Sequence, residues 1–205
     1  MNRHVAALCF VAAVVCLPAC GASTEGVLPP RVGAPPSPEV TLVWVGFGEA
    51  ERVDGERWVR APEFDYEFTV EQRRFQDRWE SVKHLRRRHP GYDGSAGPRE
   101  QTMYFRLDLA AVDAGGQVRV RITSSLGPGE GKADREFRAA HLVFHPDISS
   151  LAPFDTYRID QTYAYERGVL EETVSLDDGD RPWVRNREKA ELFGARTFTE
   201  PPTRR

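Results

Sequence analysis

Apolar and polar residues alternate along much of the chain after residue 40. In residues 64–70 the side chains of Phe64, Tyr66, Phe68 and Val70 fall on one side, and acidic or polar side chains fall on the other. A period of two is typical of a β-strand with one buried face. Similar apolar or alternating runs occupy residues 40–47, 103–109, 118–122, 137–145, 157–165 and 169–176. Gly- and Asp-containing separators between the runs predict turns, so the pattern predicts about eight short strands.

One segment, residues 78–88, has a helical period instead. Asp77 followed by Glu80 has the form of a helix N-cap with its reciprocal partner, and the His89-Pro90 pair predicts the end of the helix. A helix here places Trp79, Val82 and Leu85 on one face, which we expect to pack on the sheet. The basic residues expected on its exposed faces are Lys83, His84, Arg87 and Arg88.

These elements predict a mainly β (α+β) domain: an antiparallel sheet of about eight strands with one short early helix. The sheet either curls into a barrel or folds into a sandwich, and we favour the barrel-like form. The run of strands resembles the broad calycin and helix-grip architectures, which often enclose apolar ligands. The motifs of both families are absent from the sequence, so the resemblance is one of architecture alone.

The N-terminal residues have the order of an export signal. Arg3 precedes an almost unbroken apolar run in residues 5–15, which is too short for a membrane-spanning helix of roughly 20 residues. The run leads to Leu17-Pro18-Ala19-Cys20, which resembles the lipobox of bacterial lipoproteins. This resemblance implies cleavage after Ala19 and lipidation of Cys20, which would anchor the protein in the bacterial cell envelope. The alternative is an ordinary secretory signal cut at a nearby small residue.

The cysteines agree with lipidation. Cys9, Cys16 and Cys20 are the three cysteines of the sequence, and cleavage before Cys20 leaves that residue alone. Lipidation blocks an unpaired thiol that would otherwise be reactive in an oxidising compartment. We therefore expect a domain that is stabilised by its hydrophobic core and not by disulfides.

A proline-rich stretch follows the lipobox. Residues 21–38 contain five prolines and almost no residues suited to a core, so they predict an extended tether. We divide the chain into a signal peptide (1–19), a lipidated cysteine with its tether (20–38) and a single β-rich domain (39–205). The lipoprotein resemblance implies outer-membrane localisation, because no aspartate follows Cys20.

Charge and composition limit the classes of partner. The formal net charge is −3, so no overall positive field favours nucleic acid. Gly127-Pro128-Gly129-Glu130-Gly131-Lys132 lacks the spacing and the following hydroxyl residue of a phosphate-binding loop. His141 and His145 share one strand, but their α-carbons lie roughly 13 Å apart, too far for one metal ion. We predict no metal or cofactor.

No catalytic residue is predicted either, because no serine occurs in a nucleophile-elbow motif and no cysteine remains after cleavage. Aromatic side chains with polar ends suit either a packed core or the wall of a ligand cavity. The candidate ligand-lining residues are Tyr66, Phe68, Phe105, Tyr157, Gln161, Tyr163 and Tyr165. The candidate contacts with an anionic membrane surface are Lys83, Arg87 and Arg88.

Three classes of function are compatible with these features. The first is an envelope binding module for an apolar or amphipathic ligand, with lipid or another envelope component as its partner. The second is a structural or assembly lipoprotein that makes protein–protein contacts, and the third is an enzyme with an unrecognised site. We favour the first. The sequence leaves the oligomeric state open.

The lipobox generates the first prediction. Radiolabelled palmitate is expected to enter the wild-type protein and to be absent from Cys20→Ala, because the thiol of Cys20 is the attachment point that starts lipoprotein maturation. Gel fluorography of both proteins expressed in a diderm bacterium measures the label. Label in Cys20→Ala at the wild-type level would contradict the lipoprotein assignment.

Overall fold

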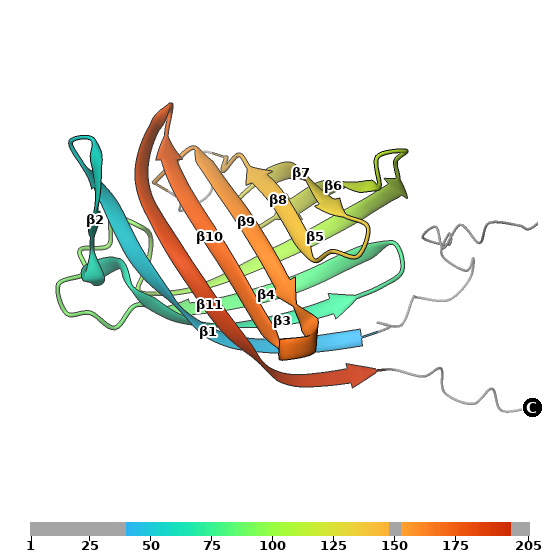
Figure 1. Cartoon of the computed structure of the whole chain (residues 1–205). Coiled ribbons are helices and arrows are strands. Elements are labelled where there is room, and N and C mark those ends of the chain that lie inside the picture. Colours follow the sequence, from blue (N-terminus) through green and yellow to red (C-terminus); the bar gives the residue numbers. More distant parts are fainter. Residues whose placement is uncertain (1–39, 148–152, 198–205) are drawn as a thin grey trace, which may run out of the picture.

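Ten antiparallel strands close into a β-barrel in the computed structural model, which describes residues 40–147 and 153–197 (Figure 1). The barrel strands are β1 (Val40–Asp54), β3 (Tyr66–Arg74), β4 (Arg78–Arg86), β5 (Glu100–Val112), β6 (Gln117–Ser124), β7 (Pro128–Asp134), β8 (Ala139–Phe144), β9 (Thr156–Ala164), β10 (Val169–Asp178) and β11 (Arg181–Thr197). A further short strand, β2 (Arg57–Arg60), forms a hairpin with the far end of β1. Cys20, the signal peptide and the tether lie outside the described residues.

The strands follow one another around the wall as a meander. From β3 to β11 each strand pairs with the next in the chain, and the long strand β1 pairs with both β3 and β11. The β1–β11 pairing closes the barrel, with Val40 opposite Thr197 and Arg52 opposite Val184. The first and last described residues therefore lie side by side at one end of the barrel (Figure 1).

The prediction of a mainly β, antiparallel, barrel-like fold is confirmed, whereas eight strands is an underestimate. The predicted helix over residues 78–88 is wrong, because this segment is strand β4 and the helices of the described residues are two short 3-10 turns. Those turns are η1 (Pro62–Phe64) and η2 (Tyr165–Arg167).

The sequence pattern predicted a helix in place of strand β4 because the inward side of this strand is partly polar. Trp79, Lys83 and Leu85 are buried at a period of two, and Arg87 continues the same side just after the strand. A buried lysine and arginine break the hydrophobic alternation on which a strand prediction depends. The expectation that Lys83 and Arg87 are exposed is therefore also wrong, whereas His84 and Arg88 are exposed.

Strand β7 lies in a glycine-rich separator between two predicted strands, where the sequence pattern predicted a turn. The structure explains the glycines by close approach of the backbone of β8. A Cβ atom at Gly129 would lie 2.4 Å from the carbonyl oxygen of Val143, and one at Gly131 would lie 2.4 Å from that of His141. Only a residue without a side chain fits at such positions.

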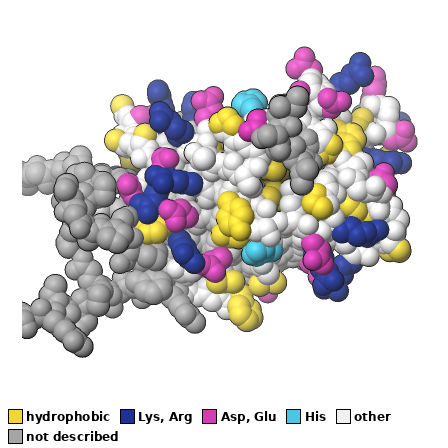
Figure 2. Space-filling model, turned by 180° about the vertical axis from the view of Figure 1, so that it is seen from behind, with side chains coloured by type: hydrophobic (Ala, Val, Ile, Leu, Met, Phe, Trp, Pro, Cys, Tyr) yellow, Lys and Arg dark blue, Asp and Glu magenta, His cyan; other side chains and the backbone are white. Residues whose placement is uncertain are grey.

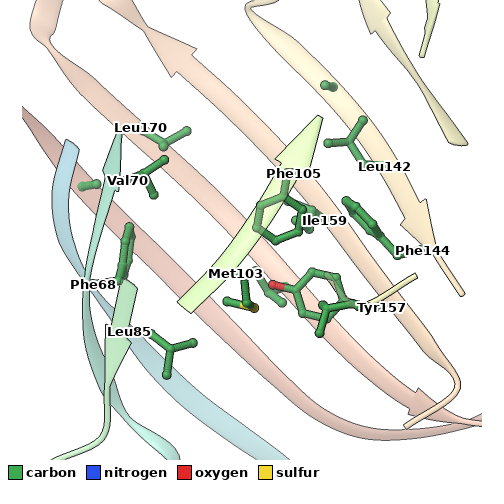
Figure 3. Close-up of a cluster of buried hydrophobic side chains, with 14 of the residues drawn as sticks. Phe68, Val70, Leu85, Met103, Phe105, Leu142, Phe144, Tyr157, Ile159 and Leu170 are labelled. Carbon is green, nitrogen blue, oxygen red and sulfur yellow. The ribbon is translucent and has the colours of Figure 1, made fainter. Parts of the chain in front are cut away.

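The barrel interior is filled with apolar and aromatic side chains contributed by strands from all around the wall. Figure 3 shows part of this core, in which side chains from β3, β4, β5, β8, β9 and β10 point toward one another. Ring pairs such as Phe105–Phe144 and Phe144–Tyr157 have centroids 5.5 Å apart in edge-to-face geometry. This is the packing of a solid core.

Basic and acidic side chains are intermixed on the outer wall. The described part of the face seen in Figure 2 carries Lys and Arg next to Asp and Glu in small groups. Pairs such as Arg88–Glu67 and Arg106–Asp108 are exposed, and exposed pairs contribute little to stability. The outer charges therefore serve solubility more than folding.

Candidate functional site

A cluster of charged side chains lies in the middle of the barrel. Lys83 of β4 donates to both carboxylate oxygens of Glu188 on β11, at 2.7 and 2.5 Å. The Lys83 Nζ atom also lies 3.5 Å from Glu172 on β10, and Tyr66 of β3 donates its hydroxyl to Glu188. The side chains of Lys83, Glu172 and Glu188 are 5%, 9% and 1% exposed. We call these four residues the central cluster.

Local strand geometry brings the two carboxylates together. Glu172 and Glu188 are directly opposite each other in the β10–β11 pairing, and both side chains point inward. Like charges at opposed positions repel. Lys83 reaches them from β4 across the interior, and its ammonium group also lies 4.4 Å from the centroid of the Phe68 ring. The cation therefore offsets a repulsion that the sheet register creates.

The protonation states follow from burial and from the neighbouring charges. Burial raises the pKa of Glu172 to about 8, Lys83 opposes this shift, and the Glu188 carboxylate adds to it. Burial alone disfavours the ammonium form of Lys83, but Glu188 and Glu172 outweigh it, so the pKa of Lys83 is raised. Burial and Glu188 also raise the pKa of Tyr66. At neutral pH the cluster is therefore a Lys83–Glu188 ion pair beside a largely protonated Glu172.

One end of the barrel is closed by an arginine on aromatic rings. Arg74 lies 3.9 Å from the centroid of the Trp79 ring and 4.8 Å from that of Tyr165. It also donates to Gln72, whose side-chain amide donates to the hydroxyl of Tyr163 at 3.1 Å. These contacts form a connected and satisfied group that seals this end.

A second arginine, Arg87, closes the opposite part of the interior. Its terminal nitrogens donate to the carbonyl oxygens of Pro98 and Ala96, at 2.8 and 3.0 Å, and its guanidinium lies 5.0 Å from the centroid of the Tyr92 ring. The residue is 7% exposed. Among the described residues it has no acidic partner, and burial lowers its pKa. A buried arginine without a carboxylate is uncommon, because buried charges are usually paired.

Two buried polar side-chain atoms, one on Arg87 and one on Asn186, lack hydrogen-bond partners in the described part of the chain. These atoms are Nε of Arg87 itself and Oδ1 of Asn186, a residue that is 4% exposed. Both residues line a cavity of about 30 Å³, whose other walls include Tyr66, Met103 and Tyr157. A cavity of this size holds about two water molecules. Two residues that line this cavity therefore carry an unused donor and an unused acceptor.

The candidate ligand-lining residues are inside the barrel but are packed together. Tyr66, Phe68, Phe105, Tyr157, Gln161 and Tyr163 are all buried. Tyr165 lies in η2, stacks on Tyr163 with ring centroids 5.3 Å apart, and donates to the carbonyl oxygen of Phe137. Two of these residues, Tyr66 and Tyr157, line the small cavity at Arg87.

The candidate anionic-surface residues are not brought together. Lys83 and Arg87 point inward and are inaccessible to a membrane surface, which corrects that expectation. Arg88 is exposed and pairs with Glu67 at 2.7 Å. Sequence reasoning did not identify Glu172, Asn186 and Glu188 as interior residues. Their inward position becomes apparent once the alternation of β10 and β11 is known.

An open hollow of about 880 Å³ lies on the outer wall over β6 to β11 and reaches Phe47 and Glu49 of β1. Charged side chains of both signs line it, among them Lys132, Glu171 and Arg187. His141 is part of this surface and lies 2.6 Å from Asp160. In residues 40–147 and 153–197 no group of three or more His, Cys, Asp or Glu side chains is placed to hold a metal ion. The hollow has no arrangement that assigns it a reaction.

Comparison of the sequence with protein-family models and with curated proteins finds no match. None of the helical segments in the described part of the chain has the length and hydropathy of a membrane-spanning helix. The candidate site is therefore defined by its own geometry: the central cluster and the adjacent cavity at Arg87.

The raised pKa of Glu172 predicts how stability depends on pH. The folded chain keeps this proton between about pH 4.5 and 8, where the unfolded chain releases it. The free energy of unfolding contributed by this group therefore falls as pH rises through that window, by up to about 1.4 kcal/mol per pH unit. In urea denaturation at pH 5 to 9, the free energy of unfolding is expected to fall less with rising pH in Glu172→Gln than in the wild type.

The matched control is Glu171→Gln, because Glu171 is the neighbouring residue on β10 and points outward. Its free energy of unfolding is expected to change with pH by the same amount as that of the wild type. If the free energy of unfolding of Glu172→Gln also changes with pH by the same amount as that of the wild type, the assignment of a protonated carboxyl group at Glu172 is contradicted.

Proposed function

We propose that the protein is an exported lipoprotein, held in the outer membrane through Cys20, whose barrel is a non-catalytic binding module. The motif at Leu17-Pro18-Ala19-Cys20 supports export and anchoring, and the closed barrel is compatible with a binding role. The proposed ligand is a small amphipathic molecule with an acidic head group. Its proposed site is the cavity at Arg87.

The observation that carries this proposal is the buried, acid-free guanidinium of Arg87 beside a cavity. Its Nε–H is a donor without a partner in the described residues, and Asn186, which lines the same cavity, has an unused acceptor in its Oδ1 atom. Leaving a buried donor or acceptor unpaired costs about 1–3 kcal/mol each. A carboxylic or phosphoric acid group accepts from Arg87, and a hydroxyl of the ligand or a retained water molecule donates to Asn186.

The size and lining of the cavity define the part of the ligand that enters. About 30 Å³ suits a head group and not an acyl chain. The apolar part of the ligand would lie against Leu85, Leu126 and Phe154, which border the same cavity and would have to separate to admit it. Apolar walls with a few placed polar groups are typical of small-molecule sites.

The central cluster is a poorer site for an acidic ligand than Arg87. Lys83 already has Glu188 within 2.5 Å and Glu172 within 3.5 Å, so an incoming anion would have to displace a carboxylate. Arg87 has carbonyl groups and the rings of Tyr66 and Tyr92 around it, and none of these is a carboxylate that an incoming anion would have to displace. We therefore place the ligand at Arg87 and assign the central cluster to the fold.

The packed core supports a second candidate, an assembly lipoprotein that acts through its outer surface. The interior cavity at Arg87 is far smaller than the roughly 300–1,000 Å³ of ordinary ligand pockets. Two water molecules would satisfy Arg87 and Asn186 if no ligand enters. Ligand binding and its dependence on these two residues separate the two candidates.

The test uses the chain from residue 20 onward with Cys20→Ala, and oleate as the probe, with isothermal titration calorimetry as the measurement. Arg87→Gln is expected to weaken oleate binding by roughly tenfold to a hundredfold, because a hydrogen bond to a charged group contributes about 1.5–3 kcal/mol. Asn186→Asp is expected to weaken binding as well, since it places an internal carboxylate beside Arg87 and leaves the bonds to Ala96 and Pro98 intact.

Arg88→Gln is the matched control, because Arg88 is the adjacent arginine and is exposed. It is expected to bind oleate like the wild type. Equal affinities for all four proteins, or no oleate binding by a folded wild-type chain, would overturn the ligand assignment and favour the assembly candidate.

A further inference from the structure

The outer wall carries an apolar stripe on the seam where the barrel closes. In the described residues the exposed large hydrophobic side chains are Val45, Phe47, Tyr104 and Phe193, which are 43%, 51%, 58% and 83% exposed. Three of these four lie on β1 and β11, whereas Tyr104 lies on β5, three strands away around the wall. We call Val45, Phe47 and Phe193 the seam stripe.

Strand pairing aligns the seam stripe along the barrel. Val45 is opposite Glu191 and Phe47 is opposite Lys189, so the outward side chains of β1 run beside those of β11. Phe193 is four positions after Lys189, which places the two phenylalanines roughly 13 Å apart along the strands. Phe193 sits at the register shift that leaves Leu192 opposite Trp44 and Gly194 opposite Val43. Phe193 is exposed because it continues the outward period of two that includes Arg187, Lys189 and Glu191.

The seam stripe lies close to the point where the preceding chain joins the barrel. β1 begins at Val40, five residues before Val45, and Val40 pairs with Thr197 at the same end (Figure 1). The 19 residues between Cys20 and Val40 reach at most about 60 Å as an extended, proline-rich segment. A lipid anchor at Cys20 would therefore keep Val40 within that distance of the membrane, and Val45 lies roughly 16 Å further along β1.

We propose that the seam stripe rests on the lipid surface to which the tether leads. This inference uses the proposed anchor at Cys20 for its geometry but needs no ligand at Arg87. Exposed phenylalanines partition into the interface between headgroups and acyl chains, and binding strength there scales with the apolar area buried. Because the anchor makes the contact intramolecular, a weak affinity of the stripe is sufficient.

Area and charge favour a lipid surface over a second copy of the chain. The three side chains expose on the order of 300 Å², whereas a stable protein interface buries about 1,200–2,000 Å². The charges next to the stripe alternate, with Lys189 beside Phe47 and Glu191 beside Val45. An apolar contact with neutral surroundings predicts binding that depends little on salt.

The experiment measures vesicle binding without the anchor. The chain from residue 20 onward, which contains every described residue, is prepared with Cys20→Ala and mixed with vesicles of phosphatidylethanolamine and phosphatidylglycerol at 3:1. We expect the partition coefficient from flotation to fall at least tenfold in Phe47→Ser/Phe193→Ser. The partition coefficient of the wild type is expected to change less than twofold between low and high salt.

Tyr104→Ser is the matched control, because it removes an exposed aromatic side chain from another part of the wall. Its partition coefficient is expected to equal that of the wild type. Equal partitioning of the wild type and the double variant would overturn the proposal. So would a wild-type dimer that the double variant abolishes without any vesicle binding, because that result assigns the stripe to a second copy. Neither result depends on lipidation of Cys20 or on oleate binding at Arg87.

Discussion

The ion pair between Lys83 and Glu188 is the interaction on which the barrel interior depends. It joins β4 to β11 across 105 positions of sequence, inside a core where both side chains are almost fully buried. Burying two charges costs several kcal/mol each, so the pair is tolerated only with good geometry and further hydrogen bonds. The hydroxyl of Tyr66 and the protonated carboxyl of Glu172 meet that requirement.

The same pair constrains the closure of the barrel. A one-residue slip of β11 along β1 would turn Glu188 to the outer face and leave Lys83 buried without its carboxylate. We therefore interpret the ion pair as a device that specifies the register of the closing strand pair, in addition to any net stabilisation. It also fills the middle of the barrel. In the part of the chain that the structure describes, a small cavity lies toward the end that contains Arg87, and the outer seam exposes apolar side chains.

Much of the fold follows from local pattern, because strands with one apolar face repeat every two residues. Residues 64–70, 118–122 and 157–165 were predicted as strands for that reason, and all three overlap strands of the barrel. The failures share a cause, which is that the inward side of a strand is not always apolar. β4 contains Lys83, and β7 contains glycines whose need arises from the approach of β8. β11 has Asn186 and Glu188 at inward positions.

The site was predictable only in part for the same reason. Aromatic residues such as Tyr66 and Tyr157 were assigned to the interior because their bodies are apolar. Alternation predicts that a single lysine, glutamate or arginine on a strand faces outward. Local sequence does not identify the ion-pair partner of such a residue when that partner lies about a hundred residues away. A period-two pattern through Trp79, Lys83, Leu85 and Arg87 was the available signal, and the helical spacing of Trp79, Val82 and Leu85 concealed it.

A double-mutant cycle on Lys83 and Glu188 tests the central claim most directly. Lys83→Met and Glu188→Gln are each expected to lower the free energy of unfolding by about 3–5 kcal/mol, because each leaves a buried partner uncompensated. The double variant is expected to lose less than the sum of the two, by at least about 1.5 kcal/mol in urea denaturation at pH 7. Losses that add to within about 0.5 kcal/mol would contradict an organising ion pair in the barrel centre.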